Sequence, residues 1–441
     1  MTIAARACWL VGLVVTASGC GGAQLVWYGH TPDRSKRVEV HQEGKTQWLA
    51  LDGRSSRRYR SIAVDELAFD PDGRRLAFAA EVGEHPERWS VVADFVESRA
   101  WDGVAGLRFG PGGRRFAYAA LDGARWQMVV DGAPERAYDE VDPASVTFSP
   151  DGLRLGYVAE DGGCSRAVID AVAGPCAARV VGFALADVAS RDVTVVADAL
   201  DGSGAHVLVG SSRFVDLASA RELAVDRAVR HWAVVSRARV GSRVVADGHD
   251  EGVFDEIDRV TWAPDGRAVA YAARSNGAWH VVVGGRVGPP YAEVEEPVFA
   301  AHGSRSGYLA RDEGRSVVTV DDRIVWESTS LATALTLSDD GTRVAWVYKD
   351  AGTSVIAVDH ERFRFETVVE KTLRFSHDSR HWAALVGSLA ERRLFLVVDG
   401  HTQLPFDAEE LFGSPGGDPG QRLGLWVSVE LELYLAAGRG S

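Results

Sequence analysis

Cysteine is scarce in this chain of 441 residues, with four in all. Two of them, Cys8 and Cys20, lie near the N-terminus, so only Cys164 and Cys176 remain in the body of the chain. No histidine is close to either in sequence, and two thiolates alone cannot complete the four-ligand shell of a zinc site. In an exported protein, which meets an oxidising compartment, we expect these two cysteines to form a disulfide.

Long apolar runs are also missing. Beyond the N-terminus no stretch reaches the roughly 18 apolar residues of a membrane-spanning helix. No useful length has helical periodicity, which excludes βαβ folds. Basic charge is limited, since 48 Lys and Arg face 62 Asp and Glu and give a net charge of −14. An acidic chain matches a phosphate backbone poorly, so we expect no nucleic-acid partner. The 46% of hydrophobic residues exclude a disordered chain.

Residues 1–19 have the features of an export signal. Arg6 precedes an apolar run from Ala7 to Ala17 that is too short to span a bilayer. The segment Ala17-Ser18-Gly19-Cys20 resembles a bacterial lipobox, and this resemblance implies that Cys20 is diacylated and becomes the first mature residue. An ordinary secretory signal is the alternative. Gly21, and not Asp, follows the cysteine, which favours the outer membrane, with the folded part in the periplasm.

A basic stretch follows the expected anchor. We interpret residues 20–37 as the anchor and a short stem, and residues 31–60 carry eight Lys and Arg against four Asp and Glu. Two interpretations stay open. The basic side chains rest on anionic lipid headgroups, or they form the solvated face of a strand.

A short motif recurs along most of the chain. Phe69-Asp70-Pro71-Asp72-Gly73 is followed by the apolar run Leu76–Phe78, and copies of both parts follow at intervals of roughly 38 residues. Clear copies begin at Phe109, Phe148 and Trp262, weaker ones at Gly303, Asp340 and Ser379, and two degenerate ones are expected near Ser190 and Val229. Proline fixes φ at the first turn position, and glycine takes the left-handed position that closes a hairpin. The motif therefore predicts a hairpin between two short strands.

An aromatic residue recurs six positions after a second glycine turn. Its copies are Tyr59, Tyr138, Phe254, Tyr291 and Phe406. Because both Tyr and Phe occur at this position, the hydroxyl is dispensable, and we expect the rings to pack between neighbouring repeats and not to bind a ligand. Trp101, Trp326 and Trp426 lie outside the register that other tryptophans share and are the candidates for an exposed binding surface.

One period holds four short strands in roughly 38 residues, which is the content of a β-propeller blade. The sequence therefore predicts an all-β fold of about ten four-stranded antiparallel blades over residues 38–436, degenerate around 160–245, with a tail at 437–441. The chain begins in mid-repeat at Trp48–Gly53 and ends in a partial repeat at 420–435, so we expect the two ends to pair within one blade. One large ring and two packed rings both remain possible.

The element Phe148-Ser149-Pro150-Asp151-Gly152, with Leu155-Gly156-Tyr157 after it, resembles the repeats of TolB-like, WD-repeat-like bacterial β-propellers. The resemblance covers nearly all of the chain beyond the signal and implies the propeller fold. It says almost nothing about function, because one fold hosts many functions. The repeat number is a departure, since propellers typically have 4–8 blades.

Catalytic motifs are missing from the sequence. Gly303–Gly307 comes close to a Gly-x-Ser-x-Gly elbow but carries Arg305 at the nucleophile position. Acidic pairs such as Asp139-Glu140 and Asp255-Glu256 recur with the repeat, which favours a structural duty over acid–base work. His231 and His381 each precede a tryptophan in an expected strand, which favours packing. We therefore assign no catalytic residue, metal ligand or cofactor, and the ligand-binding residues stay unidentified.

These patterns favour a non-catalytic envelope lipoprotein. Its propeller would present loops from many blades to a protein partner, and the lipid anchor would attach it to the membrane. The alternative is a small-molecule or glycan binder that uses the central funnel of the propeller; an enzyme using that funnel is the less favoured form of this alternative.

Overall fold

The computed structural model describes residues 23–31, 36–84, 87–200, 204–388 and 393–406. Within these ranges the chain is all-β, with three 3-10 turns, η1 (Pro111–Gly113), η2 (Ala189–Arg191) and η3 (Glu370–Thr372). The strands form ten antiparallel sheets in this part of the chain, and we number them as blades 1 to 10. No helix in the described ranges has the length and apolar character needed to cross a membrane.

The chain divides into two compact units, Met1–Ala220 and Arg221–Ser441. The described part of unit 1 contains blades 1 to 5. Blade 1 is β1 (Gln24–His30), β2 (Arg37–Glu43), β3 (Thr46–Leu51) and β4 (Arg54–Ser55); blade 2 is β5 (Ser61–Phe69), β6 (Leu76–Glu84), β7 (Glu87–Ala93) and β8 (Val96–Glu97); blade 3 is β9 (Gly103–Phe109), β10 (Phe116–Asp122), β11 (Arg125–Val130) and β12 (Ala133–Tyr138). Blade 4 is β13 (Glu140–Phe148), β14 (Leu155–Asp161), β15 (Cys164–Ile169) and β16 (Val172–Ala173); blade 5 is β17 (Arg179–Ala184), β18 (Val193–Ala197), β19 (Ala205–Val209) and β20 (Ser212–Leu217).

The described part of unit 2 contains blades 6 to 10. Blade 6 is β21 (Glu222–Val225), β22 (Trp232–Arg237), β23 (Ser242–Ala246) and β24 (His249–Phe254); blade 7 is β25 (Glu256–Trp262), β26 (Val269–Ser275), β27 (Ala278–Val283) and β28 (Arg286–Val287). Blade 8 is β29 (Glu293–Val294), β30 (Val298–Phe299), β31 (Ser306–Asp312), β32 (Arg315–Val320) and β33 (Arg323–Ser328); blade 9 is β34 (Ala332–Leu337), β35 (Val344–Asp350), β36 (Thr353–Val358) and β37 (Glu361–Phe365). Blade 10 is β38 (Thr367–Val368), β39 (Arg374–Phe375), β40 (Trp382–Ser388), β41 (Arg393–Val398) and β42 (His401–Phe406).

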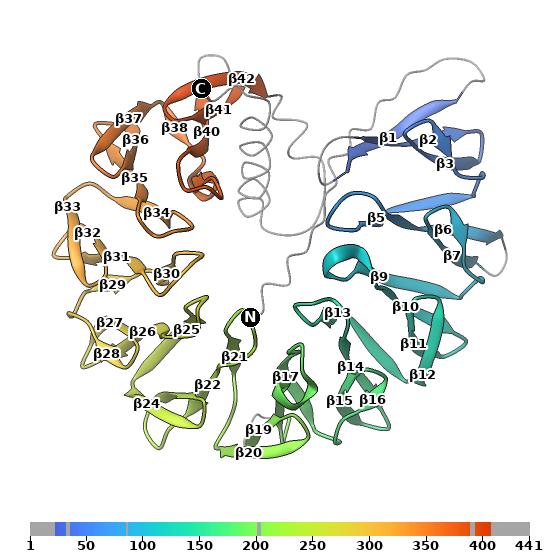
Figure 1. Ribbon diagram of the computed structural model, residues 1–441, viewed down its shortest axis with the longest axis horizontal. Coiled ribbons are helices and arrows are strands. Elements are labelled where there is room, and N and C mark those ends of the chain that lie inside the picture. Colours follow the sequence, from blue (N-terminus) through green and yellow to red (C-terminus); the bar gives the residue numbers. More distant parts are fainter. Residues whose placement is uncertain (1–22, 32–35, 85–86, 201–203, 389–392, 407–441) are drawn as a thin grey trace. The chain divides into compact units, whose positions relative to one another are not determined.

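Each blade pairs its strands in chain order, as Figure 1 shows for β25 to β28. In blades 8 and 10 the first strand is split into two short pieces that both pair with the next strand. Four-stranded antiparallel sheets that follow one another along the chain and pack face to face are the blades of a β-propeller. The fold class predicted from the repeat is therefore confirmed.

The recurring glycine closes the hairpin between the first and second strands, as predicted. Gly73 and Gly152 have φ of 65° and 71°, and their N–H groups donate to Asp70 and Ser149 carbonyl oxygens at 3.0 and 2.8 Å. A Cβ on Gly152 would lie 2.2 Å from the carbonyl oxygen of Pro111 in the preceding blade. The repeat needs glycine both for the left-handed backbone and for the close approach of neighbouring blades.

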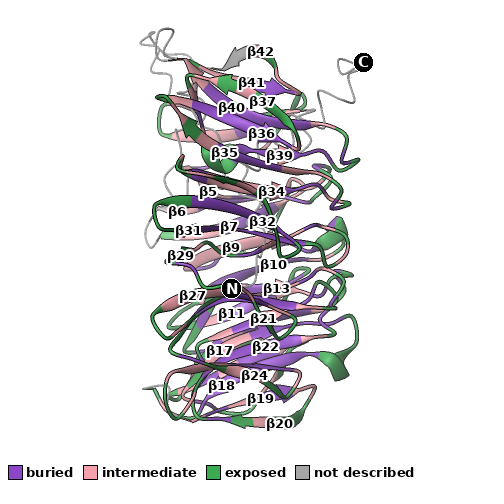
Figure 2. Cartoon of the chain, turned by 90° about the vertical axis from the view of Figure 1, so that its left-hand side faces the viewer, coloured by how far each residue is buried: buried purple, intermediate pink, exposed green. Residues whose placement is uncertain are grey.

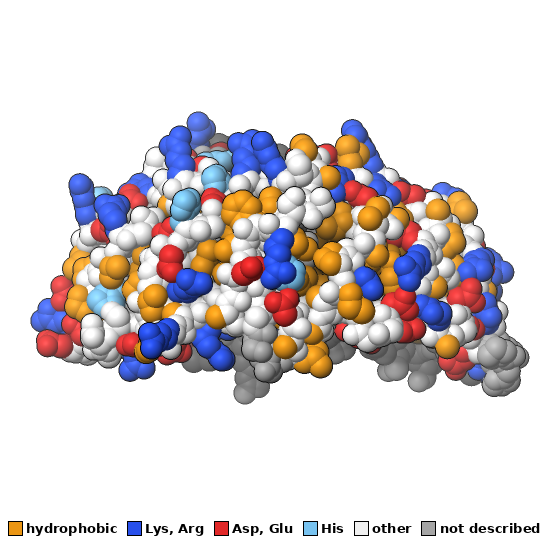
Figure 3. All heavy atoms as spheres, turned by 90° about the horizontal axis from the view of Figure 1, so that it is seen from below, with side chains coloured by type: hydrophobic (Ala, Val, Ile, Leu, Met, Phe, Trp, Pro, Cys, Tyr) orange, Lys and Arg blue, Asp and Glu red, His pale blue; other side chains and the backbone are white. Residues whose placement is uncertain are grey.

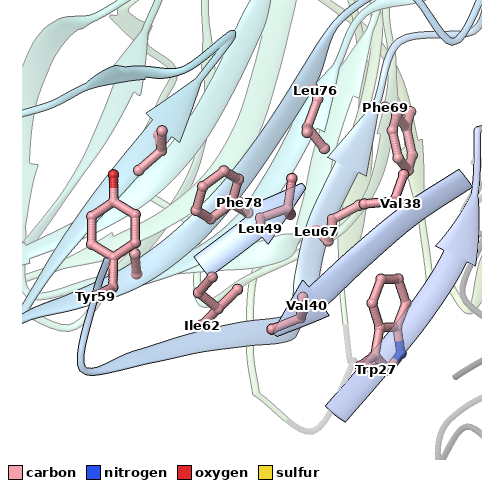
Figure 4. Close-up of a cluster of buried hydrophobic side chains, with 12 residues drawn as sticks. Trp27, Val38, Val40, Leu49, Tyr59, Ile62, Leu67, Phe69, Leu76 and Phe78 are labelled. Carbon is pink, nitrogen blue, oxygen red and sulfur yellow. The ribbon is translucent and has the colours of Figure 1, made fainter. Parts of the chain in front are cut away.

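The hydrophobic cores lie between consecutive blades of the same unit. The cluster between blades 1 and 2 joins Leu49 of β3 to Ile62 of β5 and Phe78 of β6 (Figure 4). Similar clusters fill the spaces between the later blades of unit 1 and between the blades of unit 2. The central strands are accordingly buried, and the exposed residues concentrate in turns and outer strands (Figure 2). Each blade thus needs its neighbour to cover its apolar face.

Two sequence-based boundaries are wrong. The stem predicted over residues 20–37 contains β1, so the propeller begins at Gln24 and not at residue 38. Blade 1 therefore has all four strands, and the chain does not begin in mid-repeat at Trp48–Gly53. The error arose because the segment after β1, at Thr31-Pro32-Asp33, keeps the Pro-Asp pair of the motif but lacks its glycine. The partial repeat at 420–435 and the tail at 437–441 lie outside the described residues.

The stretch around 160–245 is more regular than its sequence indicates. Blades 5 and 6 are both complete, and their turns lie at η2 and at Val229, close to the two expected degenerate copies. Val229 takes the glycine position with φ of 52°, and its N–H donates to the Asp226 carbonyl oxygen at 3.1 Å. Hairpin geometry thus persists where the motif does not. The division between the two units, after Ala220, falls within this stretch.

Candidate functional site

The two cysteines of the body are bonded in blade 4. The sulfurs of Cys164 and Cys176 lie 1.99 Å apart. Cys164 begins β15 and Cys176 follows β16, so the bond closes the outer hairpin of the blade. Cys20, the expected lipidation site, lies outside the described residues.

The recurring aromatic residues lie where the sequence places them. Tyr59, Tyr138, Phe254 and Tyr291 are all buried, each in a cluster shared by two consecutive blades. Each packs edge to face against an aromatic ring of the next blade, with ring centroids 5.9–6.3 Å apart. Phe406 ends β42, and its side chain is outside the described part. Packing, and not ligand binding, accounts for the positions of the four rings that the structure describes.

The expectation of exposed tryptophans is wrong for Trp101. It is buried, and it forms a bridge with Trp89 that corresponds to the bridge between Tyr59 and Gln47. Trp101 is thus another member of the recurring aromatic set, and its register is hidden in the sequence because Phe95, with φ of 66°, takes the position of the turn glycine six residues before the ring. Trp326 is half-buried against the rings of Trp346 and Tyr348. Trp426 lies outside the described residues.

A repeated arginine, not recognised in the sequence, connects consecutive blades. In blade 3, the Arg115 Nε donates to Asp131 at 3.0 Å, and one of its terminal nitrogens donates to the carbonyl oxygen of Leu153 in blade 4 at 2.8 Å. The aspartate also accepts from the N–H of Phe116 at 2.9 Å. We call this arrangement the blade clamp. Equivalent arginines are Arg75, Arg154, Arg305 and Arg343.

The blade clamp is most buried at Arg154. This guanidinium forms two parallel hydrogen bonds with Asp192 of blade 5, at 2.6 and 2.7 Å, and a third with Asp170 at 2.8 Å. The side chains of Arg154 and Asp192 are 13% and 6% exposed. The hydrogen bonds that Arg154 donates to Asp192 raise the pKa of Arg154 further above its usual range. Bidentate pairs of this kind are among the stronger polar contacts in proteins.

Two histidines occupy the arginine position of the clamp. His231 Nδ1 lies 2.7 Å from Asp247, and His381 Nδ1 lies 2.5 Å from Asp399. Each aspartate also accepts from the backbone N–H of the tryptophan that follows the histidine. These histidines therefore have a structural role, as expected, because each replaces the arginine of a blade clamp.

The recurring acidic residues serve the turns. Asp139 and Asp255 each accept a hydrogen bond from a backbone N–H in the hairpin tip of the next blade, at 2.8 and 3.1 Å. In the described ranges, no three His, Cys, Asp or Glu side chains lie together as potential metal ligands. The pair Glu409-Glu410 lies outside those ranges.

The polar Ser-x-Asp turns have a distinct electrostatic feature. Asp340 accepts from the backbone N–H of Thr342 at 2.9 Å and from the hydroxyl of Ser338 at 2.7 Å. These bonds favour the ionised carboxylate and lower its pKa to about 2. The same arrangement lowers the pKa of Asp151 and of Asp378.

Exposed apolar side chains lie on the outer strands of blades 2, 4, 5, 6, 7 and 8. Val287 of β28 and Ile324 and Val325 of β33 are 54%, 57% and 45% exposed. An ion pair between Arg286 and Asp322, at 3.6 Å, brings these two outer strands together. We call Val287, Ile324 and Val325 the outer-strand patch. On the face drawn in Figure 3, by comparison, apolar side chains are interspersed with charged ones.

Comparisons with known proteins show only distant likeness. No family model and no curated protein matches the chain. Among solved structures, a eukaryotic initiation factor is similar over 88% of this chain and 89% of its own, with 9% identity and a TM-score of 0.42. The Dos1 propeller is similar over 66% of this chain and 91% of its own, with 13% identity and a TM-score of 0.30. KlHsv2, with its loop 6CD replaced by a Gly-Ser linker, is similar over 76% of this chain and 96% of its own, with 11% identity and a TM-score of 0.30. We transfer no function from these proteins.

Proposed function

We propose that this protein is an exported lipoprotein of the bacterial cell envelope. Cys20 carries the lipid, the outer membrane holds it, and the propeller faces the periplasm as a non-catalytic platform for a protein partner. The charged start and apolar run of residues 1–19, and the lipobox-like end of that segment, support export and lipid attachment. The resemblance of the repeat to TolB-like propellers supports the same compartment.

The outer-strand patch carries the binding proposal. Protein interfaces have apolar cores and are enriched in arginine, and here Arg286 and Arg323 flank the exposed side chains of Val287, Ile324 and Val325. The strand β33 has a bulge between Ile324 and Trp326, which opposes the addition of another strand at this edge. The partner therefore contacts the side chains and not the strand edge.

The polar residues of the repeat favour a binding platform and not a reactive site. The blade clamps and the turn aspartates direct their charged groups at the neighbouring blade. A ligand in the funnel remains the alternative, but Trp101, one of the three tryptophans expected at an exposed binding surface, is buried.

Crosslinking tests the platform. Protein carrying Ile324→Glu and Val325→Glu is crosslinked in intact envelopes beside the unchanged protein, and captured partners are identified by mass spectrometry. We expect a partner that the unchanged protein captures and the double variant does not. Val96→Glu, on the exposed outer strand of blade 2, is the matched control and should keep the partner. If the double variant and the unchanged protein capture the same proteins, the outer-strand patch is not the platform.

Fractionation tests the anchor. In fractionation at high salt, Cys20→Ser should move the protein from the membrane fraction to the soluble fraction, because salt screens electrostatic contacts with headgroups and the lipid is then the attachment that remains. The mass of the N-terminal peptide reports acylation directly. An unmodified Cys20 in the mature protein would refute the lipoprotein proposal.

A further inference from the structure

Blade 1 differs from the rest of the chain in charge. Residues 36–60 carry seven Lys and Arg against three Asp and Glu, whereas residues 61–101, which hold blade 2, carry four against nine. The whole chain has a net charge of −14. Positive charge is therefore concentrated on the first blade of an acidic protein.

In three ion pairs of blade 1 the cation is more exposed than its acidic partner. Arg57 pairs with Glu97 and Arg60 with Glu81; the arginine side chains are 58% and 44% exposed and the glutamates only 29% and 11%. Lys45 is exposed at the tip of the β2–β3 hairpin, and Arg58 is exposed while its partner Glu43 is half-buried. An approaching surface meets the basic groups first.

Several of these groups share one end of the blade. β1 begins at Gln24, which pairs with Gln42 at the β2–β3 hairpin, so Lys45 lies at the same end as the start of β1. Tyr59 bridges Gln47 of β3 and brings Arg58 and Arg60 to this end.

An aromatic ring accompanies these cations. The Arg58 guanidinium lies 4.6 Å from the ring centroid of Trp48, and Trp48 is half-buried. Cations beside a tryptophan suit the headgroup layer of a membrane, where tryptophan is enriched.

The chain leaves little distance between this end and the expected anchor. Gln24 is four residues after Cys20, and four extended residues span at most about 14 Å. A lipid on Cys20 holds its residue at the headgroup layer, so the start of β1 stays within that distance of the phosphates. The Debye length at physiological salt is about 8 Å, which is comparable with this tether.

We propose that this end of blade 1, formed by Lys45, Trp48, Arg58 and Arg60, docks on anionic phospholipid headgroups. The proposal rests on the lipid anchor and adds to it a second, electrostatic contact that fixes which blade faces the membrane.

Vesicle binding of unacylated protein tests the surface separately from the anchor. The mature chain with Cys20→Ser is mixed with vesicles of phosphatidylcholine alone or of equal parts phosphatidylcholine and phosphatidylglycerol, and the bound fraction is measured by sedimentation. We expect binding to the phosphatidylglycerol vesicles only, and its loss as salt approaches 1 M, where the Debye length is about 3 Å.

Two matched triple variants locate the contact. Lys45→Gln, Arg58→Gln and Arg60→Gln together should weaken binding by at least about tenfold, because each cation near an anionic surface contributes measurably to attachment. Arg230→Gln, Arg239→Gln and Arg267→Gln remove the same charge from exposed arginines of blades 6 and 7 and should leave binding within about twofold. Thermal melts check that both variants are folded.

Two results would overturn the docking proposal. One is the absence of binding to phosphatidylglycerol vesicles at low salt, which would make the basic end a solvated face. The other is equal weakening by the two triple variants, which would make the attraction unspecific. Neither result tests the lipid anchor, because acylation of Cys20 is measured separately by the mass of the N-terminal peptide.

Discussion

The role of a single residue in this protein depends on its position in the repeat. Tyr138 shows this, because its buried ring meets the ring of Tyr157 in the next blade with centroids 6.3 Å apart. The equivalent ring in blade 6 belongs to Phe254, which packs against Tyr271 in the same way at 5.9 Å. The repeat itself therefore records that this position requires an aromatic ring and not a hydroxyl.

We predict that Tyr138→Ala lowers the free energy of unfolding of its unit by about 3–5 kcal/mol, the range for aromatic truncation in a core. Tyr138→Phe should cost less than about 1 kcal/mol, since the ring and its edge-on contact remain. Urea denaturation followed by tryptophan fluorescence measures both. Equal losses for the two variants would show that the hydroxyl, and not the ring, matters here.

Asp340 gives a prediction for acid pH. Its pKa of about 2 lies below the ordinary value of 3.8 because Thr342 N–H and the Ser338 hydroxyl stabilise the ionised form. A lowered folded-state pKa means that the contribution to stability is complete above about pH 4 and is lost as the pH falls towards 2. In an NMR titration, Ser338→Ala should raise the pKa of Asp340 towards 3.8. An unchanged pKa would show that the hydroxyl does not stabilise the carboxylate.

The sequence predicted these residues to different degrees. Tyr138 and Tyr291 recur at a fixed offset from a glycine, so their burial followed from the register. Trp101 was assigned to the surface because its turn lacks that glycine and the register counts from it. Its buried position follows from its bridge to Trp89, which only the strand pairing reveals.

Blades, as elements, are joined by polar contacts as well as apolar packing. The blade clamp places Arg115 between Asp131 of its own blade and Leu153 of the next. Its sequence signal was present, because a basic residue precedes an aspartate by sixteen positions in several repeats. The motif could not show that the arginine also reaches a carbonyl oxygen 38 residues away, since that contact depends on how one blade faces another.

The clamp at Arg154 should be the most costly to remove. Arg154→Ala leaves Asp192 buried without its bidentate partner, and the expected loss of unfolding free energy is about 3–5 kcal/mol. Arg115→Ala is the control, because the Arg115 and Asp131 side chains are 29% and 46% exposed, and solvent screening limits an exposed pair to about 1 kcal/mol or less. Chemical denaturation of both variants gives the comparison. Similar losses would mean that burial does not decide the strength of a clamp.

The whole molecule consists of two compact units, and the described residues place five blades in each. The repeat period predicted the number of blades well because turns recur even where strands vary. It misplaced the first blade because the segment after β1, at Pro32-Asp33, has arginine where the clear copies have glycine. No linker-like segment marks the division after Ala220, since the strands on both sides continue the same spacing.

The disulfide provides a test of this division. Cys164 and Cys176 both lie in unit 1, and a loop of this size stabilises its fold by about 3 kcal/mol in the chain-entropy model. Calorimetry with and without a reductant should show two transitions, of which only one moves to lower temperature on reduction. A single transition that shifts as a whole would show that the two units unfold together. Free-thiol counting before reduction should find neither cysteine.

The reach of the blade clamp has an evolutionary consequence. Each clamp and each aromatic pair that we describe connects a blade only to its immediate successor in the chain. Duplicating one repeat in the gene would therefore create a new blade that already carries the contacts for both of its neighbours. A chain built in this way can grow by whole repeats without redesigning its interior.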